Sequence, residues 1–191
     1  MQYTAKNIEN FMQSYEKYVS HYIVAHTHFR PFINPQSKYT GNNKTRIGKM
    51  AEQASKDCRY ALNCFSKLLY PAASNKPVRF PYLYRPLTFV TIEGANETAD
   101  KAQTIHFNIA IGNLPKVLTT DDIKTLFSHA WHEKAKLSTD VEIYEKRQNT
   151  IETWFGYTLK EAQQARYKAW ATDGIWDVNN CWIPHAALNA D

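Results

Sequence analysis

Two short stretches decide the fold: PLTFVTIE at residues 86–93 and TIHFNIAIG at residues 104–112. Both are rich in β-branched and aromatic residues, and the second alternates polar and apolar side chains as a strand does. The ten residues between them, GANETADKAQ, mostly favour turns. The two stretches therefore predict an antiparallel β-hairpin, from which the rest of the chain can be interpreted.

The spacing of apolar residues predicts further elements on both sides of this hairpin. Helices are predicted at residues 5–20, 44–69, 118–135 and 150–170, and strands at residues 21–32 and 139–147. Irregular connections are predicted at residues 35–44 and in the four-proline segment 71–86. This order predicts an α+β fold with a largely antiparallel central sheet flanked by helices.

Length and composition describe an ordinary globular protein. The chain has 191 residues, of which 43% are hydrophobic and 21% charged, which excludes disordered, collagen-like and coiled-coil classes. That length suits a single domain spanning residues 1–191. Within it, residues 1–19 form the N-terminal helical part, and residues 166–191 are expected to end in an irregular extension around Trp176 and Trp182.

The sequence also predicts the compartment. No apolar run approaches the roughly 20 residues that cross a bilayer, and the N-terminus lacks the apolar stretch of a secretory signal. The three cysteines are an odd number without zinc-ligand spacing, which favours neither a disulfide framework nor a structural zinc site. We therefore expect a reduced, cytoplasmic protein with no membrane partner.

Charge is distributed unevenly along the chain. Residues 1–85 carry 13 Lys and Arg against 4 Asp and Glu, whereas the remaining residues carry 10 against 14. A one-sided basic excess suits a polyphosphate backbone, and neighbouring aromatic side chains suit unpaired bases. A solvated basic face with ordinary core aromatics is an equally good interpretation of composition alone. The candidate DNA-binding residues are Arg30, Lys38, Lys44, Arg46 and Lys49.

A candidate metal site falls on the hairpin. Successive side chains of a strand point to opposite faces, so His106 and Asn108 project together while Phe107 faces the core. Glu93 ends the preceding strand and is expected to face them across the hairpin. A carboxylate, an imidazole and an amide oxygen are suitable ligands for Mg²⁺ or Mn²⁺. A single strand histidine is more often only a hydrogen-bonded surface residue.

The ensemble resembles the HUH endonuclease superfamily, the rolling-circle replication initiators of plasmids and single-stranded DNA phages. That superfamily has a His–hydrophobic–His strand, an acidic ligand at the end of the neighbouring strand, and a downstream helix with a nucleophilic tyrosine three residues before a lysine. Here His106 and Phe107 match the strand, Glu93 matches the acidic ligand, and Tyr157 with Lys160 in WFGYTLKEA match the helix. The resemblance covers roughly residues 20–165, the expected nuclease core.

The resemblance implies an activity and its partners. A divalent metal would polarise the scissile phosphate, and Tyr157 would attack phosphorus to give a 5′-phosphotyrosine and a free 3′-hydroxyl, with Lys160 lowering the tyrosine pKa or holding the phosphate. The substrate would be a single-stranded or hairpin DNA origin in a bacterial host. Because the chain has no Walker-type glycine-rich loop, unwinding would depend on a host helicase. Tyr144 and Tyr167 are rival nucleophiles.

One residue departs from the superfamily pattern, since Asn108 stands where the second histidine is expected. In one interpretation, a metal is bound more weakly through the shorter amide or through a water molecule. In the other, only DNA binding remains, as in a repressor or antagonist. Weaker or altered metal binding is the favoured interpretation. A transposase or relaxase of the same superfamily would share the chemistry. His26 and His28 either line the DNA groove near the metal or are polar residues on an outward face, and the second is favoured.

Overall fold

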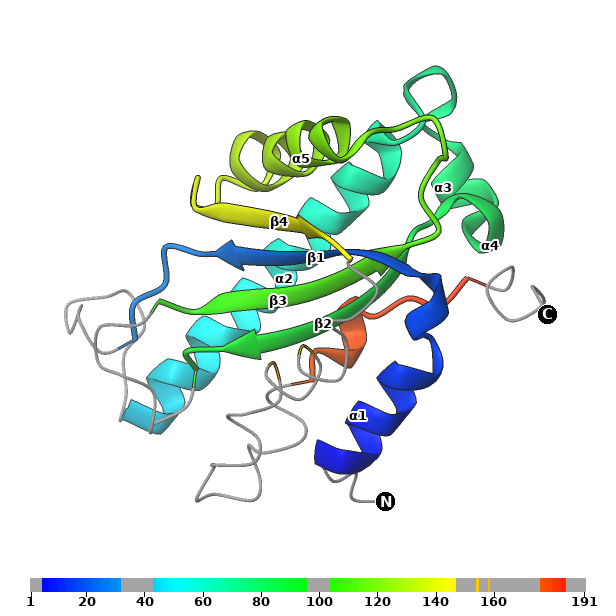
Figure 1. The fold of residues 1–191 in the computed structure, drawn as a ribbon. Coiled ribbons are helices and arrows are strands. Elements are labelled where there is room, and N and C mark those ends of the chain that lie inside the picture. The colour runs from blue at the N-terminus through cyan, green and yellow to red at the C-terminus, as the bar shows by residue number, and fades with distance from the viewer. Residues whose placement is uncertain are drawn as a thin grey trace.

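Four antiparallel strands form the central sheet in the computed structural model, which describes residues 5–31, 43–95, 104–146 and 176–184 together with Trp154 and Thr158 (Figure 1). The strands are β1 (Val19–His26), β2 (Leu87–Glu93), β3 (His106–Gly112) and β4 (Val141–Glu145), in the spatial order β2-β3-β1-β4. Helices precede and follow them in the chain. The predicted α+β fold with an antiparallel central sheet is confirmed.

The α-helices of the described residues are α1 (Ala5–Ser14), α2 (Asn43–Leu68), α3 (Lys76–Arg79), α4 (Pro81–Tyr84) and α5 (Thr120–Ser128). Short 3₁₀ turns occupy Glu16–Tyr18, Pro71–Ala73 and Val178–Asn180, and a π-helical turn, His129–Lys134, continues α5. A capping box begins α5. Thr119 accepts from the backbone N–H of Asp122 at 3.2 Å, and the Asp122 carboxylate accepts from the Thr119 N–H at 2.9 Å.

The β2–β3 hairpin has the predicted pairing. Its register runs from Leu87 opposite Gly112 to Glu93 opposite His106. Residues 96–103 of the connection lie outside the described residues. Because the pleat alternates, Phe107 points to one face of the sheet while His106 and Asn108 point to the other.

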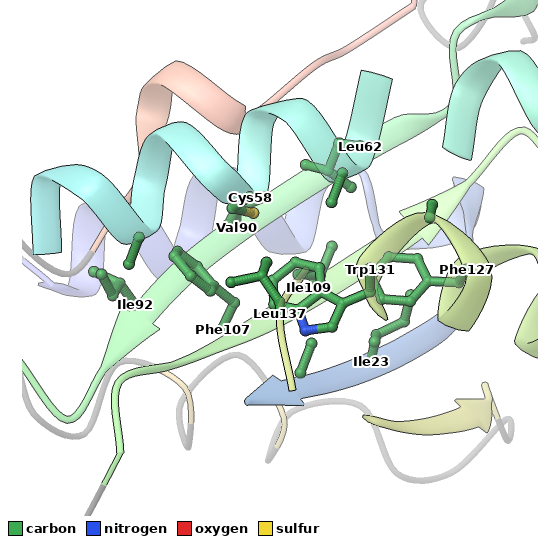
Figure 2. Close-up of a cluster of buried hydrophobic side chains, with 14 of the residues drawn as sticks. Ile23, Cys58, Leu62, Val90, Ile92, Phe107, Ile109, Phe127, Trp131 and Leu137 are labelled. Atoms are coloured by element: carbon green, nitrogen blue, oxygen red, sulfur yellow. The ribbon is translucent and has the colours of Figure 1, made fainter. Parts of the chain in front are cut away.

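One face of the sheet packs against α2, α5 and the π-helical turn around the main hydrophobic core (Figure 2). Phe107 meets Trp131 edge to face at 5.9 Å between ring centroids, and Trp131 stacks on Phe127 at 5.6 Å. The Trp131 indole N–H also donates to the carbonyl oxygen of His26 at 2.9 Å. This side chain therefore joins the helical layer to β1 by both packing and a hydrogen bond.

The opposite face is covered at one end by α1 (Figure 1). Ile8 and Met12 of α1 are buried in a smaller cluster with Tyr22, Phe89 and Ala110. The other end of this face, toward Glu93 and His106, carries polar side chains. The sheet therefore has a mainly apolar face and a face divided between apolar packing and a polar site.

Residues 176–184 run along the free edge of β2. The backbones of Thr88 and Trp182 exchange hydrogen bonds of 2.8 and 2.9 Å, and the Asp177 N–H donates to the Val90 carbonyl at 2.9 Å. The described part of this segment consists of two isolated bridges and one 3₁₀ turn. It satisfies backbone groups that an edge strand would otherwise leave open.

The predicted boundary between the first helix and the first strand was wrong. The helix ends at Ser14 and β1 begins at Val19, although the apolar spacing predicted helix to residue 20. A register shift between Val19 and His21 lets Val19 join Tyr22 in the α1 cluster. A bulge thus reproduced a helix-like spacing within a strand. The strand also ends earlier than the predicted residue 32, at His26.

The four-proline segment also differs from its prediction, because it contains two one-turn helices, α3 and α4. Pro77 and Pro81 lie in the first turn of these helices, where the missing N–H costs nothing. The expected helix at residues 150–170 lies outside the described residues except for Trp154 and Thr158, which are both in α-helical conformation. Among the described ranges, no helix has the length and apolar character needed to span a membrane.

We predict that Phe107→Ala lowers the free energy of unfolding by about 3–5 kcal/mol, because it removes a fully buried ring from the main core. Urea denaturation measures the change. Val117→Ala is the control, since Val117 is 87% exposed and should change stability by less than about 0.5 kcal/mol. Equal losses in the two variants would contradict this account of the core.

Candidate metal centre

The end of the hairpin brings a carboxylate against an imidazole. Glu93 Oε2 lies 3.1 Å from His106 Nε2, and the two side chains are 1% and 13% exposed. The other ring nitrogen, Nδ1, lies 3.1 Å from the carbonyl oxygen of Thr104. Because a carbonyl oxygen can only accept, Nδ1 carries a proton, and Nε2 is the nitrogen that faces the carboxylate.

This orientation is the one that metal-binding histidines adopt. A ligating imidazole usually donates its second N–H to a carbonyl or carboxylate, which fixes the tautomer and aims the other nitrogen at the cation. In His106 the Thr104 carbonyl serves this purpose, and Nε2 and the Glu93 carboxylate then offer two ligands side by side. Without a cation, the same two groups lie within hydrogen-bond distance of each other.

Gly94 leaves room for the Thr104 carbonyl. It follows Glu93 directly and has φ +75°, and a Cβ at this position would lie 2.4 Å from the Thr104 carbonyl oxygen. Only glycine adopts this conformation without strain and permits so close an approach. Glycine at this position therefore allows the Thr104 carbonyl oxygen to lie where it orients His106.

Asn108 is the neighbour of His106 on the same face, and it pairs across the hairpin with Thr91. Both residues are buried, with 2% and 1% exposure. Asn108 Nδ2 and Thr91 Oγ1 have no hydrogen-bond partner among the residues that the structure describes. Buried polar atoms of this kind are usually satisfied by an ordered water or a bound ligand.

The donor set of Glu93, His106 and Asn108 fits a hard divalent cation. It offers a carboxylate oxygen, an imidazole nitrogen and an amide oxygen, a combination that suits Mg²⁺ or Mn²⁺. Within the described part of the chain, no three His, Cys, Asp or Glu side chains form a metal-binding group. A cation here would therefore depend on the Asn108 amide and on water for its remaining ligands.

His26 lies beside the site. Its ring stacks on His106 at 4.8 Å between centroids, and its Nδ1 lies 2.9 Å from Thr104 Oγ1. His26 is half-buried on the face opposite the main core, where cross-strand pairing places it opposite His106. His28, two residues beyond the end of β1, is exposed. We call Glu93, His106, Asn108, Thr91 and His26 the Glu93 cluster.

Burial lowers the pKa of His26 below its usual 6.5, and the neighbouring His106 lowers it further. Asp140 and Glu142 oppose these effects, and Asp140 Oδ2 lies 3.8 Å from His26 Nε2. The net direction is downward, so the uncharged imidazole is favoured at neutral pH. His26 therefore contributes a polar, uncharged ring to the cluster.

The structure brings only some of the predicted DNA-binding residues near the cluster. Arg30 is exposed and follows β1, which ends beside the Glu93 end of the hairpin (Figure 1). Arg46 is half-buried and Lys49 exposed in the first turns of α2, which packs on the opposite face of the sheet. The side chain of Lys44 and the whole of Lys38 lie outside the described residues.

The predicted nucleophile Tyr157 and its partner Lys160 also lie outside the described residues. Two residues close to Tyr157 in sequence are described. The Trp154 ring stacks on Tyr22 at 4.3 Å, and Thr158 is fully buried. Tyr22 and His26 point to the same face of β1, so Trp154 packs on the face that carries the Glu93 cluster.

Tyr144, a rival nucleophile, is exposed on β4. Its hydroxyl donates to the Glu142 carboxylate, and this hydrogen bond raises the tyrosine pKa above its usual 10. A raised pKa disfavours the phenolate that attacks phosphorus. The local chemistry therefore argues against Tyr144.

Comparisons with protein-family models, with curated proteins and with solved structures each found no match to this chain.

We predict that His26 titrates below pH 6.5 and that His106→Gln raises its pKa, because the change removes a neighbouring positive charge. An NMR pH titration of the imidazole C–H resonances measures both values. His28, exposed and outside the cluster, serves as the internal control. A His26 pKa at or above 6.5 in the wild-type protein would show that the stacked arrangement is absent in solution.

Proposed function

We propose that the protein is a metal-dependent, tyrosine-type enzyme of the HUH class that nicks and rejoins single-stranded DNA to initiate rolling-circle replication. One observation carries the proposal. Glu93 and His106 meet at 3.1 Å on the sheet face where Trp154 packs, and the Thr104 carbonyl orients His106 as a ligand. A paired carboxylate and imidazole, on the face where Trp154 packs three residues before Tyr157 in the sequence, supports this chemistry.

Glu93, His106 and Asn108 would hold the divalent cation, Mg²⁺ or Mn²⁺. When bound, the cation supplies Lewis acidity that polarises a phosphoryl oxygen. The protein residues orient this charge: the Thr104 carbonyl keeps the proton on His106 Nδ1, and the buried Glu93 carboxylate fixes the position of the opposite ring nitrogen. Preorganised groups of this kind lower the barrier because they need no rearrangement during reaction.

The nucleophile in this proposal is the hydroxyl of Tyr157. It loses its proton and attacks phosphorus, a new O–P bond forms, and the bond to the 3′-oxygen breaks. The products are a 5′-phosphotyrosine and a free 3′-hydroxyl, and the reverse attack by a 3′-hydroxyl rejoins the strand. Lys160 would stabilise the phenolate or the phosphate. Arg30, Lys38, Lys44, Arg46 and Lys49 would contact the DNA backbone in the bacterial cytoplasm, while a host helicase unwinds the duplex.

We predict that the protein forms a covalent adduct with a labelled single-stranded oligonucleotide carrying its origin sequence in Mn²⁺, and that Tyr157→Phe abolishes the adduct. A denaturing gel measures it. Tyr144→Phe and Tyr167→Phe are the matched controls, because each removes one other phenol and should leave the adduct intact. Loss of the adduct in either control, with Tyr157→Phe still active, would assign the nucleophile elsewhere.

Asn108 favours a second candidate function. The Asn108 amide stands where the superfamily pattern has an imidazole. Both groups follow a single methylene, but the distal ring nitrogen of an imidazole lies farther from the backbone than the amide oxygen of asparagine. A protein with this change would keep the DNA-binding surface and lose the cleavage step, as a repressor or antagonist does. A transposase or relaxase of the same superfamily would differ from the first proposal only in its DNA substrate.

We predict that Asn108→His tightens Mn²⁺ binding and increases adduct formation, because it supplies a stronger nitrogen ligand. Glu93→Gln should weaken Mn²⁺ binding by at least about tenfold. Electron paramagnetic resonance of free Mn²⁺ measures both. Asp121→Asn, which removes one exposed carboxylate from the first turn of α5, is the charge-matched control. If the wild-type protein binds DNA but neither binds Mn²⁺ nor forms adducts, the result would support the second candidate function, a DNA-binding protein without cleavage activity.

A further inference from the structure

The two short helices α3 and α4 expose an unusual set of side chains at the end of the sheet away from the Glu93 cluster. Four large apolar side chains are 54–67% exposed within six consecutive residues: Val78, Phe80, Tyr82 and Leu83. Exposed apolar side chains grouped in this way usually mark an interaction surface. The adjoining bases are Lys76, Arg79 and Arg85. We call these seven residues the α3–α4 patch.

No carboxylate balances these bases in the local sequence. Residues 58–92 contain five Lys and Arg and no Asp or Glu. Lys76 and Arg79 are exposed, and the Arg85 guanidinium donates to Asn63 Oδ1 at 2.9 Å and lies 5.0 Å from the centre of the Trp182 ring. The patch therefore combines uncompensated positive charge with exposed rings.

Hydrogen bonds order the backbone that carries these rings. The N–H of Phe80 donates to the Lys76 carbonyl at 2.7 Å, and the N–H of Tyr84 donates to the Phe80 carbonyl at 3.2 Å. Pro77 is buried and anchors α3. Lys76 covers the Tyr84 ring at 4.7 Å, whereas Phe80 and Tyr82 remain exposed. A preformed surface loses little conformational entropy on binding.

We propose that the α3–α4 patch binds single-stranded nucleic acid, with Phe80 and Tyr82 stacking on bases and with Lys76 and Arg79 contacting phosphates. A single strand is the partner whose chemistry matches both features, since it presents flat apolar bases beside a continuous negative backbone. This proposal depends on the proposed function only in taking the nucleic acid to be DNA. Binding here requires neither a metal nor cleavage.

The position of the patch makes it distinct from the Glu93 cluster. Arg85 lies two residues before Leu87, where β2 begins, and β2 then runs to Glu93 in the cluster. Six strand steps correspond to about 20 Å. A strand engaged at both places would therefore be held several nucleotides from the point of cleavage, where it adds affinity without touching the reacting phosphate.

The test measures binding of a fluorescent oligodeoxythymidylate of about 16 nucleotides by anisotropy in EDTA. Phe80→Leu keeps an apolar side chain but removes the ring, and Phe80→Trp keeps a ring. We expect Phe80→Leu to weaken binding about tenfold and Phe80→Trp to bind like the wild type. Because Phe80 is 54% exposed, both variants should keep the wild-type melting temperature.

A second pair of variants tests the charge. Arg79→Ala should reduce the slope of log affinity against log salt by about 0.7, as expected for one phosphate contact on a single strand. Lys134→Ala, an exposed base in the π-helical turn, should leave the slope unchanged. Equal slopes in Arg79→Ala and the wild type would overturn the phosphate contact.

Unchanged oligonucleotide affinity in Phe80→Leu, or equal losses in Phe80→Leu and Phe80→Trp, would overturn the stacking role. If Phe80→Leu instead weakens only sedimentation with phosphatidylserine vesicles, the patch is a membrane surface and the proposal is wrong. Failure to form a Tyr157 adduct would leave these EDTA measurements unaffected, so failure of the nicking function and failure of the patch are distinguishable.

Discussion

The contact between Glu93 and His106 depends on the register of a single hairpin. β2 and β3 pair so that the end of β2 and the start of β3 coincide beside their connection, and this places the last carboxylate of one strand opposite the first imidazole of the other. A slip of one residue would move His106 to the core face and bring Phe107 out to the polar face. The register is maintained from the other side of the sheet, where Phe107, Ile109 and Val90 are buried in the main core. The site is thus positioned by apolar packing that it does not touch.

The two faces of the sheet carry different tasks. The face toward α2 and α5 is mainly apolar, and Trp131 links it to β1 through the His26 carbonyl. His26 uses its backbone in this contact while its side chain lies on the opposite face beside His106. Among the described residues, the apolar packing on the second face involves α1, Trp154 and Trp176, and the end toward Glu93 accommodates buried polar groups. The hydrophobic core and the Glu93 cluster are therefore both attached to β1 at His26.

The C-terminal segment 176–184 and the α3–α4 patch meet at the β2 edge. Trp182 pairs with Thr88 through its backbone, while its ring lies near Arg85 and Tyr82. An edge strand is open to pairing with other chains, and this segment covers it with bonds from the same chain. The same contact places an aromatic ring beside the exposed rings of α4. Protection of the edge and construction of the patch therefore follow from one packing arrangement.

The sequence by itself determined the hairpin, the α+β class and the shared face of His106 and Asn108, because strand alternation and turn-forming residues are local signals. It also indicated that Glu93 would face His106, since the last residue of one hairpin strand pairs with the first residue of the next. It misplaced the start of β1, where a bulge imitated helical spacing, and it missed α3 and α4 because prolines in a first turn resemble a break. Only the tertiary structure decided that His26 joins the cluster and that α2 places Arg46 and Lys49 on the other face. Those facts depend on which strands become neighbours and which face each helix covers, and long-range packing sets both.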